Sequence, residues 1–353
     1  MISDKEYCMS SFLSLRTVYD VSKCFFDGIS IQFFENNPDR FPVSNSRELE
    51  ERLRIEVEKA CKKGKAALAL SGGIDSAILA KYMPKGSVAY TFQCVVPGFS
   101  VTDETPIAKK YADECGMEHR VVKIYWEDYL LYAPLLMKRK GAPIHSIEVQ
   151  IYKAALQARE DGFDTLIFGE SADVNYGGQD GLLSRDYTTE EYMDRYTYIK
   201  PEMVLNNPVS LYQAFADYSH NGAMDVHEFN RNVYYCESMA SYENACAVAK
   251  IQFCAPYSKT WMAIPLDYHR VRNGENKYLV REIFQRLYKE FSVPPKLPMP
   301  RPMNEWMKDW EGPKRKEFKD SLDMRKFSGD QKWLLFCLEN FLNMHDIATE
   351  NNS

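Results

Sequence analysis

The stretch ALALSGGIDSAILAKYMP, residues 67–84, decides the fold. Its first residues, Ala67 to Leu70, are apolar and predict a buried strand, and Ile74 to Met83 predict a helix that stops before a proline. The joint between them, Ser71 to Ser76, holds two glycines, two serines and an acid. Glycines at a strand end let the backbone approach a ligand closely, and the N–H groups that begin the next helix favour anions, phosphates above all.

The acid in this joint limits what can bind there. A carboxylate at Asp75 repels a phosphate unless it holds a Mg²⁺ ion that bridges phosphate oxygens, with the Ser71 and Ser76 hydroxyls donating to them. The alternative is a tight strand-to-helix turn with a Ser/Asp cap. Two glycines alone do not choose between these interpretations.

Strand and helix signals alternate on both sides of this joint. We expect strands at 66–70, 87–96, 120–126 and 165–169. We expect helices at 45–61, 74–83, 105–115 and 146–160. This alternation predicts an α/β fold with a parallel sheet flanked by helices.

The signals change at both ends of this region. Residues 1–44 predict an N-terminal arm, with the apolar run Ile29 to Phe34 as a short strand or a packed segment. Residues 45–185 form the predicted α/β domain that carries this joint. Past residue 185 strand signals are sparse, and we expect a mostly helical part over 186–353 that completes the active site.

Composition excludes several classes of function. The 353 residues are 45% hydrophobic and carry a net charge of −6, which argues against a nucleic-acid partner bound on a broad basic surface. The nine cysteines include no C-x-x-C pair, which indicates reduced thiols and no structural zinc site. Without a signal peptide pattern or a run of eighteen apolar residues, we expect a cytoplasmic protein with no membrane partner.

A second candidate site follows the strand DTLIFG. There the chain continues into GESADVNYGGQ, residues 169–179, in which Glu170 and Asp173 are three residues apart and can face the same side. Gly177 and Gly178 again permit close approach of the backbone. In isolation this segment predicts no more than a polar turn with a capping acid.

Taken in order, these motifs resemble a known family. SGGIDS after a buried strand is similar to the PP-loop of the ATP pyrophosphatases, and no Walker A G-K-[ST] follows it. GESADVNYGG resembles the G-E-x-x-D-E-x-x-G-G segment of the asparagine synthetase family, and GENKYLVREIF, residues 274–284, resembles that family's K-x-x-L-R helix. CAPYSKTW, just upstream, is similar to another segment of the family, with Pro256 and Tyr257 in place. The resemblance covers about residues 45–310.

The resemblance implies a PP-loop fold, related to the adenine-nucleotide α-hydrolases (HUP-like), with a helical C-terminal extension. It also implies ATP and Mg²⁺ as cofactors and ATP-dependent adenylation of a substrate carboxylate, followed by attack of ammonia or an amine. The residues it assigns to the nucleotide are Leu70, Ser71, Gly72, Gly73, Asp75, Ser76, Phe92 and Gly169. Asp75 and Asp173 would hold the metal, Lys277 would neutralise pyrophosphate and then the oxyanion, and Glu170 would act as general base. Arg281 lies one turn after Lys277.

Three features set this chain apart from the family pattern. Val174 and Ser258 stand where the family usually has acids, and GAPIHSIEVQ, residues 141–150, lacks the usual acceptor-side pattern, so aspartate is not assumed as substrate. The chain begins Met1-Ile2, and only about 70 residues precede the PP-loop, so we expect a stand-alone form without a glutaminase domain. Nitrogen would come from free ammonia, from a separate glutaminase subunit or from an amine on the substrate.

Two alternatives stay open at this point. An NAD-synthetase-like or thiolating PP-loop enzyme would also adenylate its substrate. A non-catalytic nucleotide-binding subunit of a glutamine amidotransferase would bind ATP without releasing pyrophosphate.

Overall fold

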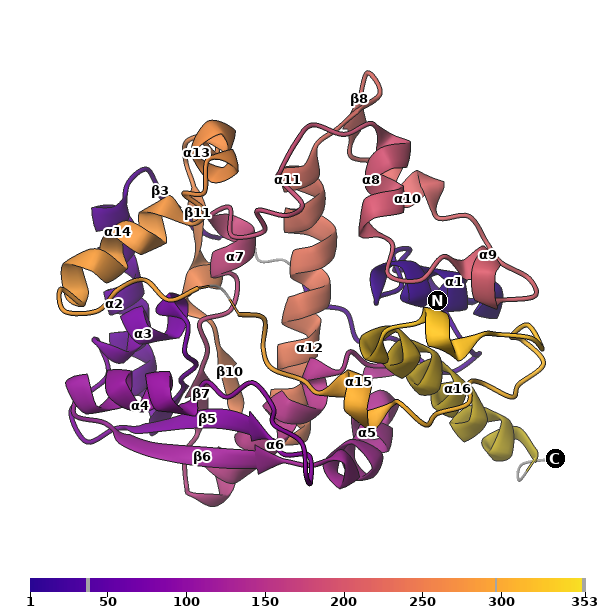
Figure 1. Cartoon of the computed structure of the whole chain (residues 1–353), viewed down its shortest axis with the longest axis horizontal. Coiled ribbons are helices and arrows are strands. Elements are labelled where there is room, and N and C mark those ends of the chain that lie inside the picture. The colour runs from indigo at the N-terminus through magenta and orange to yellow at the C-terminus, as the bar shows by residue number, and fades with distance from the viewer. Residues whose placement is uncertain (36–38, 296, 351–353) are drawn as a thin grey trace.

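A five-stranded parallel sheet organises the molecule (Figure 1). The computed structural model describes residues 1–35, 39–295 and 297–350, with side chains to residue 346. The sheet order is β10-β7-β4-β5-β6. Its strands are β4 (Ala66–Ala69), β5 (Val88–Cys94), β6 (Glu118–Ile124), β7 (Thr165–Ile167) and β10 (Gln252–Cys254). The four predicted strands and their parallel pairing are confirmed.

The fifth strand is the one that sequence patterns missed. β10 is three residues long and pairs with β7 through Phe253 and Leu166. Such a short run carries no period-2 signal. Because this edge strand comes from beyond residue 185, the last part of the chain shares the sheet with the predicted ATP-binding domain. The division at residue 185 stays a prediction.

Alternate side chains of a strand point to opposite faces of the sheet, and each face packs into a separate apolar core. Ala67 and Ala69 of β4 pack with one apolar cluster, and Leu68 packs with the other, as the two-residue period of a strand requires. The first core is covered by α5 (Trp126–Lys140), α6 (Ile147–Glu160) and α12 (Tyr235–Val248). The second is covered by α2 (Ser46–Lys63), α3 (Ile74–Ala80), α4 (Thr105–Glu114) and α14 (Tyr278–Leu287).

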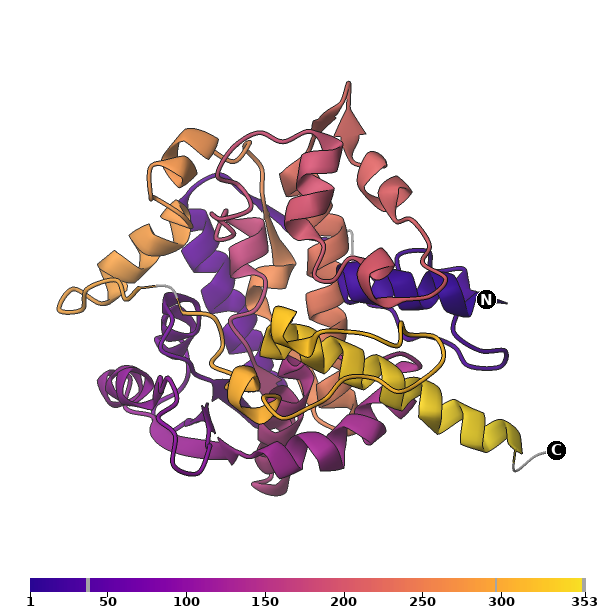
Figure 2. The same cartoon turned by 45° about the vertical axis from the view of Figure 1, so that its right-hand side comes forward.

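The N-terminal segment is part of the first core. Helix α1 (Lys5–Leu15) buries Phe12 and Leu13 fully and lies beside α16 (Gly329–Glu350), on the side of the molecule away from α14 in both views (Figures 1 and 2). The rings of Phe25 and Phe341 pack edge to face at 5.0 Å. Residues 29–34 form no strand, so the predicted short strand is wrong. The segment packs against the first core instead, as the alternative prediction had it.

Shorter elements connect these layers. They are β1 (Ile2–Ser3), β2 (Lys23–Cys24), β3 (Phe41–Val43), α7 (Ala172–Asn175), α8 (Thr189–Tyr196), α9 (Pro201–Val204), α10 (Tyr212–Ala216), β8 (Ser219–His220), β9 (Ala223–Met224), α11 (Val226–Phe229), β11 (Thr260–Met262), α13 (Tyr268–Arg272), α15 (Met303–Trp306), a π-helical turn over Asn230–Tyr234, and 3₁₀ turns over Pro256–Lys259 and Met324–Lys326. Among the described residues, no helix has both the length and the apolar character needed to cross a membrane. The cytoplasmic location stays a prediction.

Candidate active site

The two motif loops meet because their strands are neighbours. β4 pairs with β7 in parallel, with Leu68 opposite Ile167, so both loops leave the same edge of the sheet. A cavity of about 360 Å³ lies there. Of the predicted site residues, it is lined by Leu70, Ser71, Asp75, Ser76, Phe92, Gly169, Glu170 and Asp173. Gly72, Gly73 and Lys277 line an adjoining recess of about 130 Å³ that shares Ser71, Asp75 and Asp173 with the cavity.

Hydrogen bonds within the first loop fix its shape. The Ser71 N–H donates to Ser76 Oγ at 3.0 Å, the two hydroxyls are 3.0 Å apart, and the Gly73 N–H donates to Ser71 Oγ at 3.1 Å. The Gly72 N–H donates to Glu104 Oε2 at 3.2 Å. A carboxylate therefore occupies one N–H of the loop predicted to bind anions. Burial raises the pKa of Glu104, and the Gly72 N–H offsets part of that rise.

The third motif joins the first two through its lysine. Lys277 Nζ lies 2.7 Å from Asp75 Oδ2 and 3.0 Å from Asp173 Oδ1, although 202 residues separate it from Asp75. Its side chain is only 9% exposed. Burial alone would lower the pKa of Lys277, but the two carboxylates outweigh that effect and raise it above its ordinary value. The ammonium is therefore held charged between the two predicted metal ligands.

Two glycines stand where a Cβ would clash, one between the two loops and one within the second loop. A Cβ at Gly169 would lie 2.9 Å from the backbone N of Ser76, and a Cβ at Gly178 would lie 2.0 Å from Asp173 Oδ1. Gly72 and Gly73 face no such clash, since the nearest side-chain atoms would be 3.4 and 3.3 Å away. The close contact between the two loops thus requires glycine at 169, and the turn within the second loop requires glycine at 178. Gly72 and Gly73 line the adjoining recess, and their N–H groups already donate to Glu104 Oε2 and Ser71 Oγ.

Comparison with known proteins now names the family. The family model described as asparagine synthase matches residues 48–249, more than half of the 353-residue chain. The chain belongs to the asparagine synthase family. Membership supports an ATP-utilising enzyme of the ligase type. A search of curated proteins finds no significant match.

Solved structures similar to this asparagine synthase family member have low sequence identity. The U34-tRNA thiolase NcsA of Methanococcus maripaludis, described with its [4Fe-4S] cluster, is 15% identical with a TM-score of 0.27, covering 71% of this chain and 82% of its own. NMN synthetase of Francisella tularensis is 13% identical with a TM-score of 0.28, covering 72% and 100%. NH₃-dependent NAD synthetase of Campylobacter jejuni, in complex with nitrate, is 12% identical with a TM-score of 0.27, also covering 72% and 100%.

In this asparagine synthase family member, helix α12 supports the acid at the second motif. Ser238 Oγ donates to Glu170 Oε1 at 3.0 Å, and Tyr242, one turn later, lines the same cavity. Burial raises the pKa of Glu170, and hydrogen bonds from the Ser171 N–H and from Ser238 offset part of the rise. A carboxylate with a raised pKa suits proton transfer near neutral pH.

The donor set fits a magnesium ion but not a metal held by protein alone. Among the described residues, no group of three or more His, Cys, Asp or Glu side chains could hold a metal. Asp75 and Asp173 supply two carboxylates, each bound to Lys277. Mg²⁺ commonly takes one or two protein carboxylates and completes its shell with substrate phosphates and water. The two aspartates therefore fit this type of magnesium site.

Other predicted positions have mixed outcomes. Phe92 lines the cavity, and Cys94 of the same strand is buried and donates its Sγ–H to the carbonyl of Pro300, which also lines the cavity, at 3.3 Å. Tyr257 donates its OH to the Asp75 carbonyl at 3.2 Å. The Arg281 guanidinium donates to the backbone carbonyl and to the side chain of Asn276, and not to Asp75 or Asp173, the carboxylates that pair with Lys277.

Sequence reasoning missed several cavity residues. They are Arg16, Glu104, His145, Tyr234, Tyr242 and Arg301. Each lies outside the three motifs, and a lone arginine or tyrosine carries no local signal of function. Their positions depend on tertiary packing: Arg16 reaches the cavity from the end of α1, and Arg301 reaches it from the 297–301 segment.

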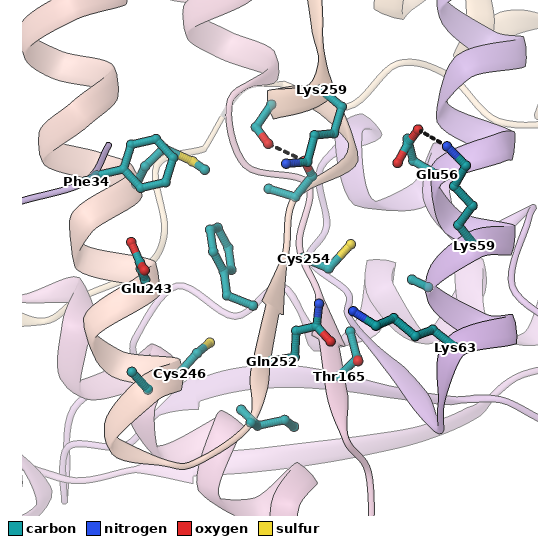
Figure 3. Close-up of a pocket in the computed structure, with 17 residues that line it drawn as sticks. Phe34, Glu56, Lys59, Lys63, Thr165, Glu243, Cys246, Gln252, Cys254 and Lys259 are labelled. Atoms are coloured by element: carbon teal, nitrogen blue, oxygen red, sulfur yellow. Dashed lines mark hydrogen bonds and ion pairs between the residues drawn. The ribbon is translucent and has the colours of Figure 1, made fainter. Parts of the chain in front are cut away.

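A larger hollow elsewhere is a less suitable active site. It measures about 520 Å³ and lies beside β10, between α2 and α12, as Figure 3 shows. Its charged side chains include Lys63, Glu243 and Lys259, while Glu56 and Lys59 pair with each other at 3.1 Å. Its lining, as far as the structure describes the chain, includes none of the predicted site residues.

Proposed function

We propose that the protein is an ATP-dependent, AMP-forming ligase that joins a substrate carboxylate to ammonia or an amine. The observation that carries this proposal is the lysine of the third motif, bound to one aspartate of each of the other two motifs beside the serine-glycine loop. A chain that had lost nucleotide chemistry would have no need to bury this charge cluster.

In the first step, a carboxylate oxygen attacks the α-phosphorus of ATP. A new P–O bond forms, the bond to the β-phosphate oxygen breaks, and acyl-adenylate and pyrophosphate result. The N–H groups at the start of α3 and the Ser71 and Ser76 hydroxyls would bind the phosphates, and Lys277 would neutralise the leaving pyrophosphate. Mg²⁺, which Asp75 and Asp173 would hold, supplies further neutralisation of phosphate charge when bound.

In the second step, ammonia or an amine attacks the acyl carbon. The C–O bond to AMP breaks, and the nitrogen must lose a proton as the amide forms. Glu170 would accept that proton, and Ser238 would keep the carboxylate oriented through its 3.0 Å hydrogen bond. Lys277 would also stabilise the oxyanion at the acyl carbon.

The test is product analysis with purified protein, Mg-ATP, NH₄⁺ and a panel of carboxylates led by aspartate. We expect AMP and pyrophosphate with at least one carboxylate. In Glu170→Gln, amide formation should fall while pyrophosphate exchange into ATP persists, since the base acts only in the second step. ATP binding without AMP from any carboxylate would reject the ligase proposal in favour of a nucleotide-binding subunit, and thiolation without an amide product would favour the thiolating alternative.

A further inference from the structure

The backbone N–H groups of the serine-glycine loop already have acceptors within the protein. The Ser71 N–H donates to Ser76 Oγ at 3.0 Å, and the Gly73 N–H donates to Ser71 Oγ at 3.1 Å. These two acceptors are neutral hydroxyls of the loop itself. The Gly72 N–H donates instead to Glu104 Oε2 at 3.2 Å, a carboxyl oxygen from a position 32 residues away in the chain. An acidic group therefore lies against the loop that is assigned to the phosphates.

Glu104 faces the space that the phosphates need. It lines both the active-site cavity of about 360 Å³ and the adjoining recess of about 130 Å³. The other residues common to the two linings are Ser71, Asp75, Asp173 and Leu297. The Glu104 side chain thus lies at the junction that also holds a loop serine and the two aspartates assigned to the metal. A phosphate that enters this junction meets the Glu104 carboxyl group.

The charge of Glu104 is poorly compensated. Among the residues that the structure describes, no lysine, arginine or histidine forms an ion pair with it, and the ammonium of Lys277 in the same recess is bound to Asp75 and Asp173. Burial raises the pKa of Glu104, a backbone N–H offsets part of the rise, and the nearby Asp103 adds to it. A half-buried carboxylate without a cation gains little from its position. An anion that arrives with its own Mg²⁺ can therefore displace it.

The position of Glu104 in the chain allows its carboxyl group to leave the loop. Residues 97–104 connect β5 to α4 without regular secondary structure, and residues 97–100, 102 and 103 are exposed. Glu104 is the last residue of this connection, directly before α4. Its side chain has several rotatable bonds and borders open space, so the carboxyl group can turn away from the Gly72 N–H while α4 stays in place.

We propose that Glu104 is an internal competitor for the phosphates of the nucleotide. It accepts from the Gly72 N–H while the site is empty, leaves when Mg-bound phosphates occupy the loop, and returns as pyrophosphate departs. The inference rests on the proposed function, because it takes the loop to bind the phosphates of ATP and takes pyrophosphate to be the leaving product. It adds a residue that limits the affinity for nucleotide and promotes the release of pyrophosphate.

A purely structural role for Glu104 predicts the opposite effect of its removal. If the carboxyl group only kept the loop in shape, its loss would loosen the loop and weaken the binding of phosphates. If it competes with them, its loss removes a negative charge beside the phosphates and a contact that they must break, so binding becomes tighter. The direction of the change in affinity therefore separates the two roles.

Binding measurements test this independently of turnover. The full-length protein is titrated calorimetrically, in the presence of Mg²⁺, with pyrophosphate and with α,β-methylene-ATP, which cannot be cleaved between its α- and β-phosphates. Glu104→Gln keeps the volume and one acceptor but removes the charge, and Glu104→Ala removes the acceptor as well. We expect each variant to bind pyrophosphate about three- to ten-fold more tightly, the size of one charge repulsion or one displaced hydrogen bond, and α,β-methylene-ATP to change in the same direction.

Asp103→Asn is the matched control, because it removes a negative charge from the adjacent residue. The Asp103 carboxylate accepts from the Gln93 side chain and the Thr105 N–H and lines neither space, so affinity should stay within two-fold of the wild type.

The possible outcomes separate this proposal from the ligase function. Unchanged or weaker pyrophosphate binding in the Glu104 variants, loss of the fold in both of them by circular dichroism, or an equal gain in Asp103→Asn would each overturn the proposal and leave the ligase function standing. Binding that appears only in the Glu104 variants would support the competitor role. Absence of pyrophosphate and nucleotide binding from all four proteins would overturn the competitor role and the ligase function together.

Discussion

Replacing Lys277 by methionine removes a buried cation that joins the three motifs. Methionine keeps most of the volume and leaves Asp75 and Asp173 facing each other without the ammonium that lies 2.7 and 3.0 Å away. If Lys277 stabilises the charge that develops on pyrophosphate and on the acyl oxygen, its loss should lower kcat for AMP formation about 10²–10³-fold, the cost of losing one preorganised donor to a developing charge.

The same substitution should also lower stability, by an amount that the burial of the cluster limits. Breaking a fully buried ion pair costs about 3–5 kcal/mol. Here the Asp75 and Asp173 side chains are 20% and 37% exposed, so solvent screens part of the repulsion and we expect a loss of about 1–3 kcal/mol. Because the pKa of Lys277 is raised, its stabilisation is fully present below the ordinary lysine value and disappears only as pH rises through the higher folded value. The difference should therefore stay constant between pH 7 and 9.

Two assays separate these effects. Urea unfolding monitored by circular dichroism gives the stability difference, and AMP release under saturating Mg-ATP gives kcat with the carboxylate that supports turnover. Lys259→Met is the matched control, since Lys259 is exposed and lines the hollow beside β10. A folded Lys277→Met protein whose kcat stays within three-fold of the wild type would refute the catalytic assignment of Lys277.

Three further outcomes are expected around the second motif. Burial raises the pKa of Glu170, so the rate of amide formation should fall as pH drops through a value above the ordinary carboxyl range. This acid limb of the pH–rate profile should vanish in Glu170→Gln. A limb that persists in the variant would contradict the role of Glu170 as base. Ser238→Ala removes a donor that favours the charged carboxylate, so the limb should move to higher pH, and an unmoved limb would mean that Ser238 does not tune the base. Gly169→Ala places a Cβ 2.9 Å from the Ser76 backbone N, so we expect about 1–3 kcal/mol of destabilisation and weaker ATP binding by calorimetry; wild-type values of both would show that the loops can separate without cost.

The strands and the convergence of the motifs were predictable from sequence for a physical reason. Buried parallel strands such as Ala66–Ala69 need continuous apolar residues, and the loops at their ends need polar residues and glycine at fixed positions. These are local requirements, which leave local patterns. The order of the strands then brings residues about a hundred positions apart, such as Asp75 and Asp173, to one edge of the sheet.

The missed features depend on contacts that no local pattern records. β10 is too short to show alternation, and α1 shows no clear amphipathic stripe because eight of its eleven residues are buried. Arg16 reaches the cavity only because α1 ends in a left-handed residue against Tyr198 and Glu237. An arginine at position 16 looks like any surface arginine until that packing is known.

Val174 and Ser258, the two departures from the family pattern, pack beside Ala255 and not against the Lys277 ammonium. Val174 is 2% exposed and packs with Tyr235, Met239 and Ala255 in a small apolar group. Ser258 donates its hydroxyl to the Ala255 carbonyl at 2.7 Å, within the same neighbourhood. An apolar side chain at 174 therefore suits the surroundings that this chain builds there, and neither substitution removes a contact of Lys277.

The position of Val174 and Ser258 outside the Lys277 cluster bears on whether the protein is a catalyst or a nucleotide-binding subunit. A loss of acids such as those at positions 174 and 258 is what would favour the non-catalytic subunit. The cluster of Lys277 with Asp75 and Asp173 is present in spite of the desolvation cost of burying an ammonium, although hydrophobic side chains of similar volume often replace buried ion pairs without loss of stability. A chain that needed only to bind a nucleotide or to fold would have had a simpler solution. We therefore favour the proposed ligase, in which Lys277 of this cluster would neutralise the charge that develops on pyrophosphate during adenylation.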